Sequence, residues 1–213
     1  MMSIPADRRS RKRLATRQNI SKVATRLFLE RGFDQVTVDE VAKAADVGRM
    51  TVFNYFPRKE DMFFDRDEEG RELLIEALRQ RAADVSPIEA LRRLAHRLVT
   101  EHSPFVEFSA DSQLFLATVE ASETLKARAR AIRNELTQAL TEVLAECVGR
   151  DPADADAYLA VSLAMATGAA ALLQAHRVFR LQQDSEQATA VFLSMVEKGV
   201  AGLNAALADT PYV

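Results

Sequence analysis

The strongest constraint on the fold is a set of long segments in which apolar residues recur every three or four positions. One such series steps by 4, 3, 4, 3 and 4 positions through Leu125, Ala129, Ile132, Leu136, Ala139 and Val143. This spacing places all of them on one face of an α-helix, whereas a strand would need strict alternation. Only 7 glycines and 6 prolines interrupt the 213 residues, which favours long helices over many short strands. We therefore expect an all-α protein.

The same periodicity and the usual capping residues divide the rest of the chain into helices. The expected helices cover residues 20–31, 37–45, 49–56, 58–80, 87–98, 125–149, 153–181 and 185–207, with shorter helices within 105–119. Gly70 is a candidate bend in the fourth of these. Two short helices joined by a turn that contains Gly48 have the plan of a helix-turn-helix. We expect one domain over residues 1–64 and a second over 65–213.

The charged residues are distributed unevenly along the chain. Residues 1–31 hold nine Lys or Arg and two acidic residues, whereas residues 65–213 hold 15 basic and 23 acidic residues. A basic end can attract an anionic partner, although a solvated basic tail has the same composition. The segment RRSRKR at residues 8–13 precedes the first expected helix, as basic arms that reach into the DNA minor groove do. A flexible tail that adds only nonspecific attraction is the alternative.

Several classes of protein are disfavoured. The single cysteine, Cys147, cannot form an intramolecular disulfide, and no Cys/His cluster suits zinc, which fits a reducing cytoplasm. No apolar signal-peptide core follows the basic N-terminus, so we expect a cytoplasmic protein. Residues 157–175 contain no charged side chain and have the length of a membrane span. Their many alanines favour a buried, close-packed helix instead, and we expect no membrane association.

Metal binding and catalysis find little support. Residues 65–76 nearly fit the calcium-loop pattern, but Glu69 and Glu72 depart from it, so we expect a solvated helix and no metal. His96, His102 and His176 form no HExxH motif, and the chain contains no GxSxG motif and no P-loop. We expect neither a catalytic site nor a cofactor.

The most informative segment is TVDEVAKAADVGRMTVFNYFPRKEDM at residues 37–62. It resembles the motif T-x-x-x-I-A-x-x-A-G-V-S-x-x-T-x-Y-x-Y-F-x-x-K-E of the TetR family of bacterial transcriptional regulators, over Lys22 to Met62. Gly48 stands where the family usually has a capping Ser, and Phe53 stands where a Tyr is common. Neither departure shifts the register, so the resemblance implies that the helix-turn-helix binds DNA. A helix-turn-helix that only packs is the alternative.

A recognition helix offers the side chains of its first turn to base edges in the major groove. Arg49 occupies this turn and can bond guanine O6 and N7, which is worth ~1–3 kcal/mol of discrimination, while the next two residues supply methyl and hydroxyl contacts. The resemblance implies phosphate contacts from Thr37, Tyr55 and Lys59. The expected DNA-binding residues are Thr37, Arg49, Met50, Thr51, Asn54, Tyr55 and Lys59.

The resemblance also implies an effector pocket and a dimer interface in the second domain. The expected ligand-binding residues combine apolar bulk with a few polar groups: His96, Phe105, Phe108, Gln113, Phe115, Val119, Met165, His176 and Phe179. In the family the last two helices form the dimer interface as a four-helix bundle. The small or flexible side chains assigned to that interface are Ala164, Gly168, Ala171, Ala175, Met195, Gly199 and Gly202. Ordinary core packing is the alternative for both sets.

These observations predict a homodimeric repressor that binds a palindromic DNA operator and is released by a small apolar effector. The stretch FNYFPRKEDMFFD resembles that of family members thought to sense acyl-CoA-like ligands, which implies a long apolar ligand. The alternative is a helical dimer that binds a small molecule or a protein without reading DNA.

Overall fold

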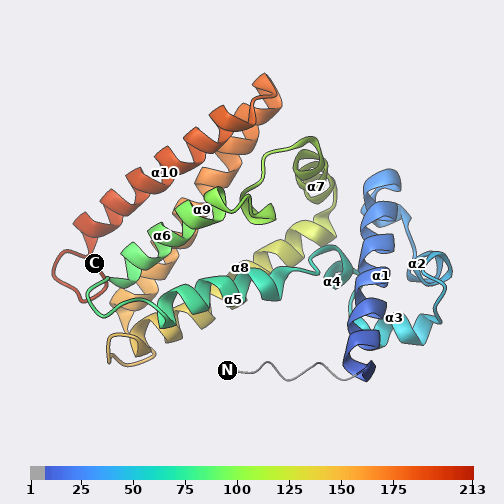
Figure 1. The fold of residues 1–213 in the computed structure, drawn as a ribbon, viewed down its shortest axis with the longest axis horizontal. Coiled ribbons are helices and arrows are strands. Elements are labelled where there is room, and N and C mark those ends of the chain that lie inside the picture. The colour runs from blue at the N-terminus through green and yellow to red at the C-terminus, as the bar shows by residue number, and fades with distance from the viewer. Residues whose placement is uncertain (1–7) are drawn as a thin grey trace. The chain divides into compact units, whose positions relative to one another are not determined.

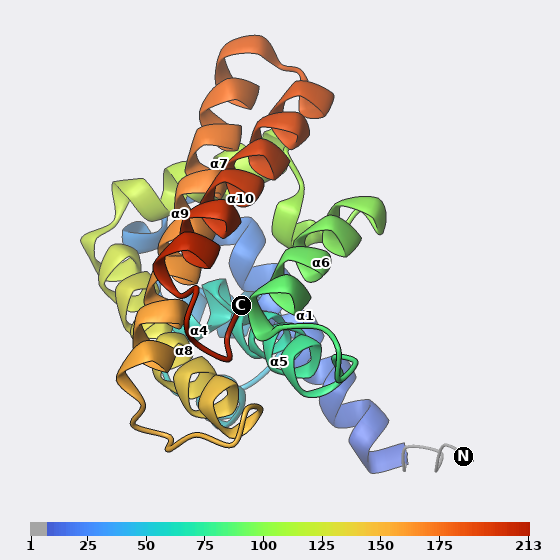
Figure 2. The same ribbon diagram turned by 90° about the vertical axis from the view of Figure 1, so that its left-hand side faces the viewer.

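The computed structural model describes residues 8–213, and within this range the chain is helical without a strand (Figures 1 and 2). The expectation of an all-α fold is therefore confirmed. The α-helices are α1 (Arg8–Arg31), α2 (Val38–Ala44), α3 (Arg49–Tyr55), α4 (Lys59–Phe63), α5 (Asp67–Arg79), α6 (Pro87–Thr100), α7 (Ala110–Ala121), α8 (Glu123–Glu146), α9 (Ala155–Gln182) and α10 (Ser185–Ala206). Two 3₁₀ turns, Phe33–Gln35 and Pro104–Val106, lie between them.

The chain forms two compact units. The first contains the described residues up to Arg66 together with Leu114–Arg128, and the second contains Asp67–Gln113 and Ala129–Val213. The sequence suggested a single division near residue 64, but residues 114–128 pack with the first unit. The physical reason is that Leu125 is fully buried in the core of that unit, with Phe115 and Val119 packed against it.

The first helix is longer than its apolar face predicts. Ile20, Ala24 and Phe28 are fully buried and form the face that packs into the first unit. α1 nevertheless begins at Arg8, so the basic segment forms the first turns of this helix and does not precede it as an arm. Residues 9–15 of this extension are exposed, and Arg, Lys, Ala and Leu all favour helix, which explains why the helix extends beyond its buried face.

The helix-turn-helix forms where the sequence predicts it. Thr37 caps α2 with a capping box to Glu40, and Gly48 is the N-cap of α3 without a side-chain cap bond. Asp46 lies in the turn between the helices with φ of 54°, a left-handed conformation that short polar residues tolerate. The next break separates α4 from α5 at residues 64–66, ahead of Gly70, which lies within α5.

The second unit is built around α9 and α10, which run antiparallel, with α6 beside α10 (Figure 1). A buried cluster around Leu78, Leu144 and Val161 lies toward one end of this unit, and a second cluster includes Ala175 and Phe192. The chain continues after α10 into a tail whose Tyr212 is fully buried.

The alanine-rich helix α9 is only partly buried. Its buried face includes Ala157, Ala160 and Ala171, whereas Leu159 and Leu173 are exposed by 43% and 53%. The expectation of a buried, close-packed helix is therefore wrong for one face. In the part of the chain that the structure describes, α9 is the helix long and apolar enough to cross a membrane, a test that core helices of soluble proteins also pass.

Candidate functional site

The recognition helix α3 is anchored on one side and exposed on the other. Val52 is fully buried and Phe56, at the C-cap, is 1% exposed, so these two side chains fix the helix in the first unit. Met50 is 71% exposed, and Arg49 and Asn54 are also exposed. Thr51 lies between them and is half-buried. The outer face of α3 therefore presents the side chains that the sequence assigned to base contacts.

Arg49 already has a partner in the free protein. Its Nη1 lies 2.9 Å from Oδ2 and 3.2 Å from Oδ1 of Asp39, on α2. The guanidinium also lies over the ring of Phe53, 5.5 Å from its centroid. The sequence analysis did not predict a role for Asp39. The signal that could have indicated it is its position in the first turn of α2, the helix that precedes the turn to Arg49.

Thr37 is committed to capping α2. Its hydroxyl donates to Glu40 Oε2 at 2.9 Å and accepts from the Glu40 N–H at 3.2 Å, while its own N–H donates to Oε2 at 2.8 Å. The backbone bond from Thr37 and the hydrogen bond from Arg31 hold the pKa of Glu40 at about 2. Both donors of Thr37 are therefore in use, so a phosphate contact would have to compete with the cap.

Lys59 does not point toward solvent as a phosphate ligand would. Its ammonium donates to the carbonyl oxygen of Phe33 and lies 4.1 Å from the centroid of the Phe33 ring and 5.5 Å from that of Phe28. Burial lowers the pKa of Lys59. A phosphate contact from the Lys59 ammonium would therefore have to compete with this carbonyl and the two rings.

Basic side chains of α1 lie beside the end of the recognition helix. Arg13 lies over the Tyr55 ring at 6.0 Å from its centroid, and Arg17 lies over Phe56 at 4.8 Å. Asn19 Nδ2 donates to the carbonyl of Ala45 at 3.0 Å, which ties α1 to the end of α2. The first turns of α1 thus add positive charge next to half-buried Tyr55, a placement that sequence reasoning did not foresee.

The second unit contains an apolar cavity of about 430 Å³. Of the expected ligand-binding residues, Phe105 and Met165 line it. Ala164 and Gly168, which the sequence assigned to the dimer interface, line it as well. Leucines, valines and alanines from α5, α6, α8, α9 and α10 supply most of the remaining wall. Its size and lining are typical of small-molecule sites.

Two expected ligand residues belong to the first unit instead. Phe115 stacks on Phe63 with ring centroids 4.4 Å apart and an interplanar angle of 12°, and Val119 packs against the same core. These contacts remove both residues from the cavity. Phe115 was expected in the effector pocket as an aromatic residue at helical spacing, but its ring packs in the core of the first unit.

The remaining polar candidates lie outside the cavity lining. Gln113 Nε2 donates to the carbonyl of His176 at 2.8 Å and lies 2.9 Å from His176 Nδ1. Phe108 packs edge-on against the His176 ring at 5.0 Å, and Phe179 is buried in the same cluster. Burial lowers the pKa of His176. These residues form a packed core region of the second unit.

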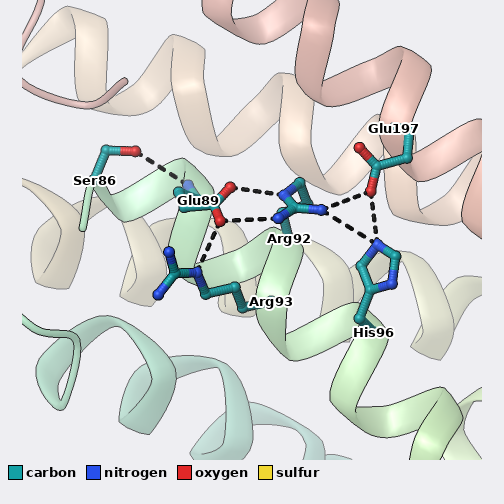
Figure 3. A network of polar contacts seen from close by, with 6 residues as sticks. All are labelled: Ser86, Glu89, Arg92, Arg93, His96 and Glu197. Atoms are coloured by element: carbon teal, nitrogen blue, oxygen red, sulfur yellow. Dashed lines mark hydrogen bonds and ion pairs between the residues drawn. The ribbon is translucent and has the colours of Figure 1, made fainter.

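His96 belongs to a charged network between α6 and α10 (Figure 3). Its Nε2 lies 2.6 Å from Glu197 Oε1, and Arg92 donates to the same oxygen at 2.9 Å and to both oxygens of Glu89. Arg93 also donates to Glu89, at 2.7 Å. Hydrogen bonds from Arg92 and Arg93 lower the pKa of Glu89 to about 2. The network links α6 to α10. One of its residues, Arg92, also lines the cavity.

Several residues expected at a dimer interface are used inside the chain. Ala171 and Ala175 are fully buried, and a Cβ on Gly199 would overlap the side chain of Thr167. Met195 packs in part against the core, whereas Gly202 is exposed. Ala171, Ala175 and Gly199 therefore serve the packing of α9 against α10 within one chain.

The comparisons with known proteins agree with this fold. Residues 20–65 match the model of bacterial regulatory proteins of the tetR family. The HTH-type transcriptional regulator TcmR of Streptomyces glaucescens is 32% identical over 83 residues, which are 39% of this chain and 37% of TcmR. The match thus spans little more than a third of that curated relative.

Solved structures extend the similarity to most of the chain. NalD, the secondary repressor of the MexAB-OprM multidrug efflux pump in Pseudomonas aeruginosa, is 23% identical with a TM-score of 0.58, over 88% of this chain and 97% of NalD. Thermus thermophilus FadR, a TetR family transcriptional repressor in complex with lauroyl-CoA, is 26% identical with a TM-score of 0.51, over 88% and 92%.

An exposed recognition helix in a helix-turn-helix, joined to a helical unit with an apolar cavity, defines the class of helix-turn-helix transcriptional regulators. Residues 20–65 thus match the tetR family of bacterial regulatory proteins, and the chain as a whole is similar in fold to a solved TetR family repressor.

Proposed function

We propose that the chain is a ligand-responsive repressor that binds a palindromic operator as a homodimer and is released by a small apolar effector. The observation that carries this proposal is the exposed face of α3, where Arg49 and Met50 point outward while Val52 holds the helix in the core. A helix-turn-helix that only packs would bury this face. A helical dimer that binds a small molecule or a protein but not DNA is less favoured for the same reason.

On DNA, Arg49 exchanges Asp39 for the O6 and N7 atoms of a guanine. The exposed ion pair is weak in water, whereas a bidentate contact to guanine is worth ~1–3 kcal/mol of base discrimination. Met50 and Asn54, which are four residues apart and exposed on α3, supply further contacts. The basic turns of α1 add sequence-independent attraction to phosphates.

The dimer interface of this proposal lies on the exposed face of α9 and α10. Leu159, Leu163 and Leu173 form an exposed apolar stripe on α9, with Leu181 further along at 70% exposure. On α10, Ala201 and the other exposed small residues, Gly202 included, allow a second pair of helices to approach closely. Two subunits would then present two recognition helices to two operator half-sites.

The effector of this proposal occupies the apolar cavity of the second unit. A ligand that binds a released conformation more tightly than the operator-bound one lowers operator affinity by that difference in binding free energy. Lauroyl-CoA is a suitable first compound for screening, because FadR binds it and its acyl chain suits an apolar wall.

Selection from random duplex DNA with the purified, ligand-free protein tests the proposal. Salt near the physiological concentration suppresses purely electrostatic binding, so only base readout survives the selection. Enrichment of one inverted repeat is the expected result. A folded protein that enriches no sequence, even after extraction of copurified small molecules, overturns the repressor proposal and favours a module that does not read DNA.

A further inference from the structure

The cavity is apolar except for a few charged side chains at its wall. The charged residues among its lining are Asp67 and Arg71 of α5, Arg92 of α6 and Arg133 of α8. Arg92 is neutralised by Glu89 and Glu197 in the network that joins α6 to α10. The cations that remain for a ligand are therefore Arg71 and Arg133.

Arg133 is exposed and forms no ion pair among the residues that the structure describes. It precedes Leu136 and Leu140 on the cavity-lining face of α8, so it stands at one end of an apolar stripe. Arg71 pairs only loosely with Glu68, at 3.9 Å, and also lies in the N-terminal half of its helix. The C-terminal ends of α5 and α8 meet through Arg79 and Glu146, so both arginines lie toward the opposite end of the cavity.

Gly168 leaves space in the cavity and makes its helix less stable than an alanine would. It lies in the middle of α9, lines the cavity, and has nothing within 4 Å of the position that a Cβ would occupy. An alanine would fit there and would favour the helix more than glycine does. A residue that weakens its helix while leaving room in a cavity is typical of a functional site.

We propose that the effector is an amphipathic anion, with an apolar chain in the cavity and one carboxylate paired with Arg133. This inference rests on the proposed function, because it names the chemical class of the effector. A neutral ligand gains nothing from the unpaired guanidinium, and a cationic ligand is repelled by it.

Calorimetric titration of the full chain with sodium dodecanoate and with 1-dodecanol, both below the concentration at which they aggregate, tests the inference. The two probes share the apolar chain and differ in the head group. We expect dodecanoate to bind up to about fivefold more tightly, the scale of an ion pair that remains partly in water. Raising the salt concentration should reduce this preference.

Four variants locate the binding. Arg133→Gln should remove the preference for dodecanoate without changing the affinity for dodecanol. Arg130→Gln is the matched control, because Arg130 is an exposed arginine on the same helix outside the cavity lining, and it should keep the preference. Gly168→Leu should weaken both probes by filling the cavity, and Gly168→Ala provides the milder change if the leucine variant does not fold.

Equal binding of the two probes, or a preference that persists in Arg133→Gln, overturns the assignment of the anion to Arg133. Binding that persists unchanged in a folded Gly168→Leu variant overturns the cavity as the site. Operator binding by the same ligand-free preparation is measured in parallel. Intact operator binding with no binding of either probe overturns the ligand class alone, whereas loss of operator binding in the ligand-free protein overturns the proposed function.

Discussion

Arg49 and Asp39 form an ion pair across the two helices of the helix-turn-helix, with Nη1 of the arginine 2.9 Å from Oδ2 of the aspartate. Both side chains are largely exposed, at 60% and 64%. Exposed pairs of this kind contribute about 0–1 kcal/mol, so a guanine can displace Asp39 at little cost. Asp39 therefore competes with DNA for the arginine and also places a negative charge close to the expected phosphates.

Asp39→Asn should strengthen operator binding a few-fold, because it releases Arg49 and removes a charge that repels DNA. Arg49→Ala should instead relax base preference at one operator position, by ~1–3 kcal/mol at that position. Fluorescence anisotropy with the selected operator and with single-base variants measures both effects. Uniform loss of affinity for all sequences in Arg49→Ala would mean that this side chain contacts only the backbone.

Lys59→Met should lower the free energy of unfolding by about 1–2 kcal/mol, since it removes a charged hydrogen bond to Phe33 and cation–π contacts to two rings. Lys43→Met is the control, because Lys43 is exposed in α2 and should change stability by less than about 0.5 kcal/mol. Urea denaturation gives both values. Unchanged stability combined with a smaller salt dependence of DNA binding would restore Lys59 to a phosphate contact.

Gly199→Ala should destabilise the protein by about 1–3 kcal/mol, because the added Cβ would overlap Thr167 where α10 crosses α9. Gly168→Ala should stabilise it by up to about 1 kcal/mol, since nothing lies within 4 Å of the new Cβ and alanine favours the helix. Thermal denaturation of the two variants provides the comparison. Equal effects of the two substitutions would show that α9 and α10 are not in contact at Gly199.

Acid should weaken the second unit through Glu89. Arg92 and Arg93 lower the folded-state pKa of Glu89 to about 2 from an ordinary value of 4.5. The stabilisation is therefore complete above about pH 4.5 and is lost as the pH falls toward 2. Glu89→Gln should show a smaller decrease in urea midpoint between pH 5 and pH 3 than the unmodified chain. Parallel decreases in the two proteins would place the acid sensitivity elsewhere.

Leu173→Glu should weaken the proposed dimer, because a charge would replace an exposed leucine on the apolar stripe of α9. Leu114→Glu is the matched control, since Leu114 is 45% exposed on α7, outside this stripe. Sedimentation velocity measures the molecular mass of each variant. A Leu173→Glu protein that sediments with the mass of the unmodified chain would move the interface away from this face.

The sequence predicts the helix-turn-helix well because its signals are local. The Thr37 cap, the turn before Gly48 and the apolar spacing around Val52 each act within a few residues. The segments that follow are predicted less well. The sequence predicts one helix over residues 58–80, whereas the structure has two, α4 and α5, because Phe64 and the two residues after it are not helical.

The ligand and dimer assignments depend on distant contacts that periodicity does not encode. Phe115 has the spacing of any apolar helical residue, and only the tertiary structure shows that its ring stacks on Phe63. Gly168 and Gly199 are equally small, yet one lines a cavity and the other admits Thr167. His96 lies outside the cavity lining and pairs with Glu197 of α10, a contact across 101 residues of sequence.

Residues 114–128 complete the core of the first unit, and this makes the unit impossible to transplant as a single piece. A fragment that ends at Arg66 would leave the Phe63 ring without Phe115 and Asp61 without its ion pair to Arg128, at 3.2 Å. The chain passes between the units within α7 and α8, so no flexible linker offers a cutting site there. A chimaera that carries this DNA-reading unit on another sensor must therefore graft two stretches of sequence, with part of the sensor's own helices among them.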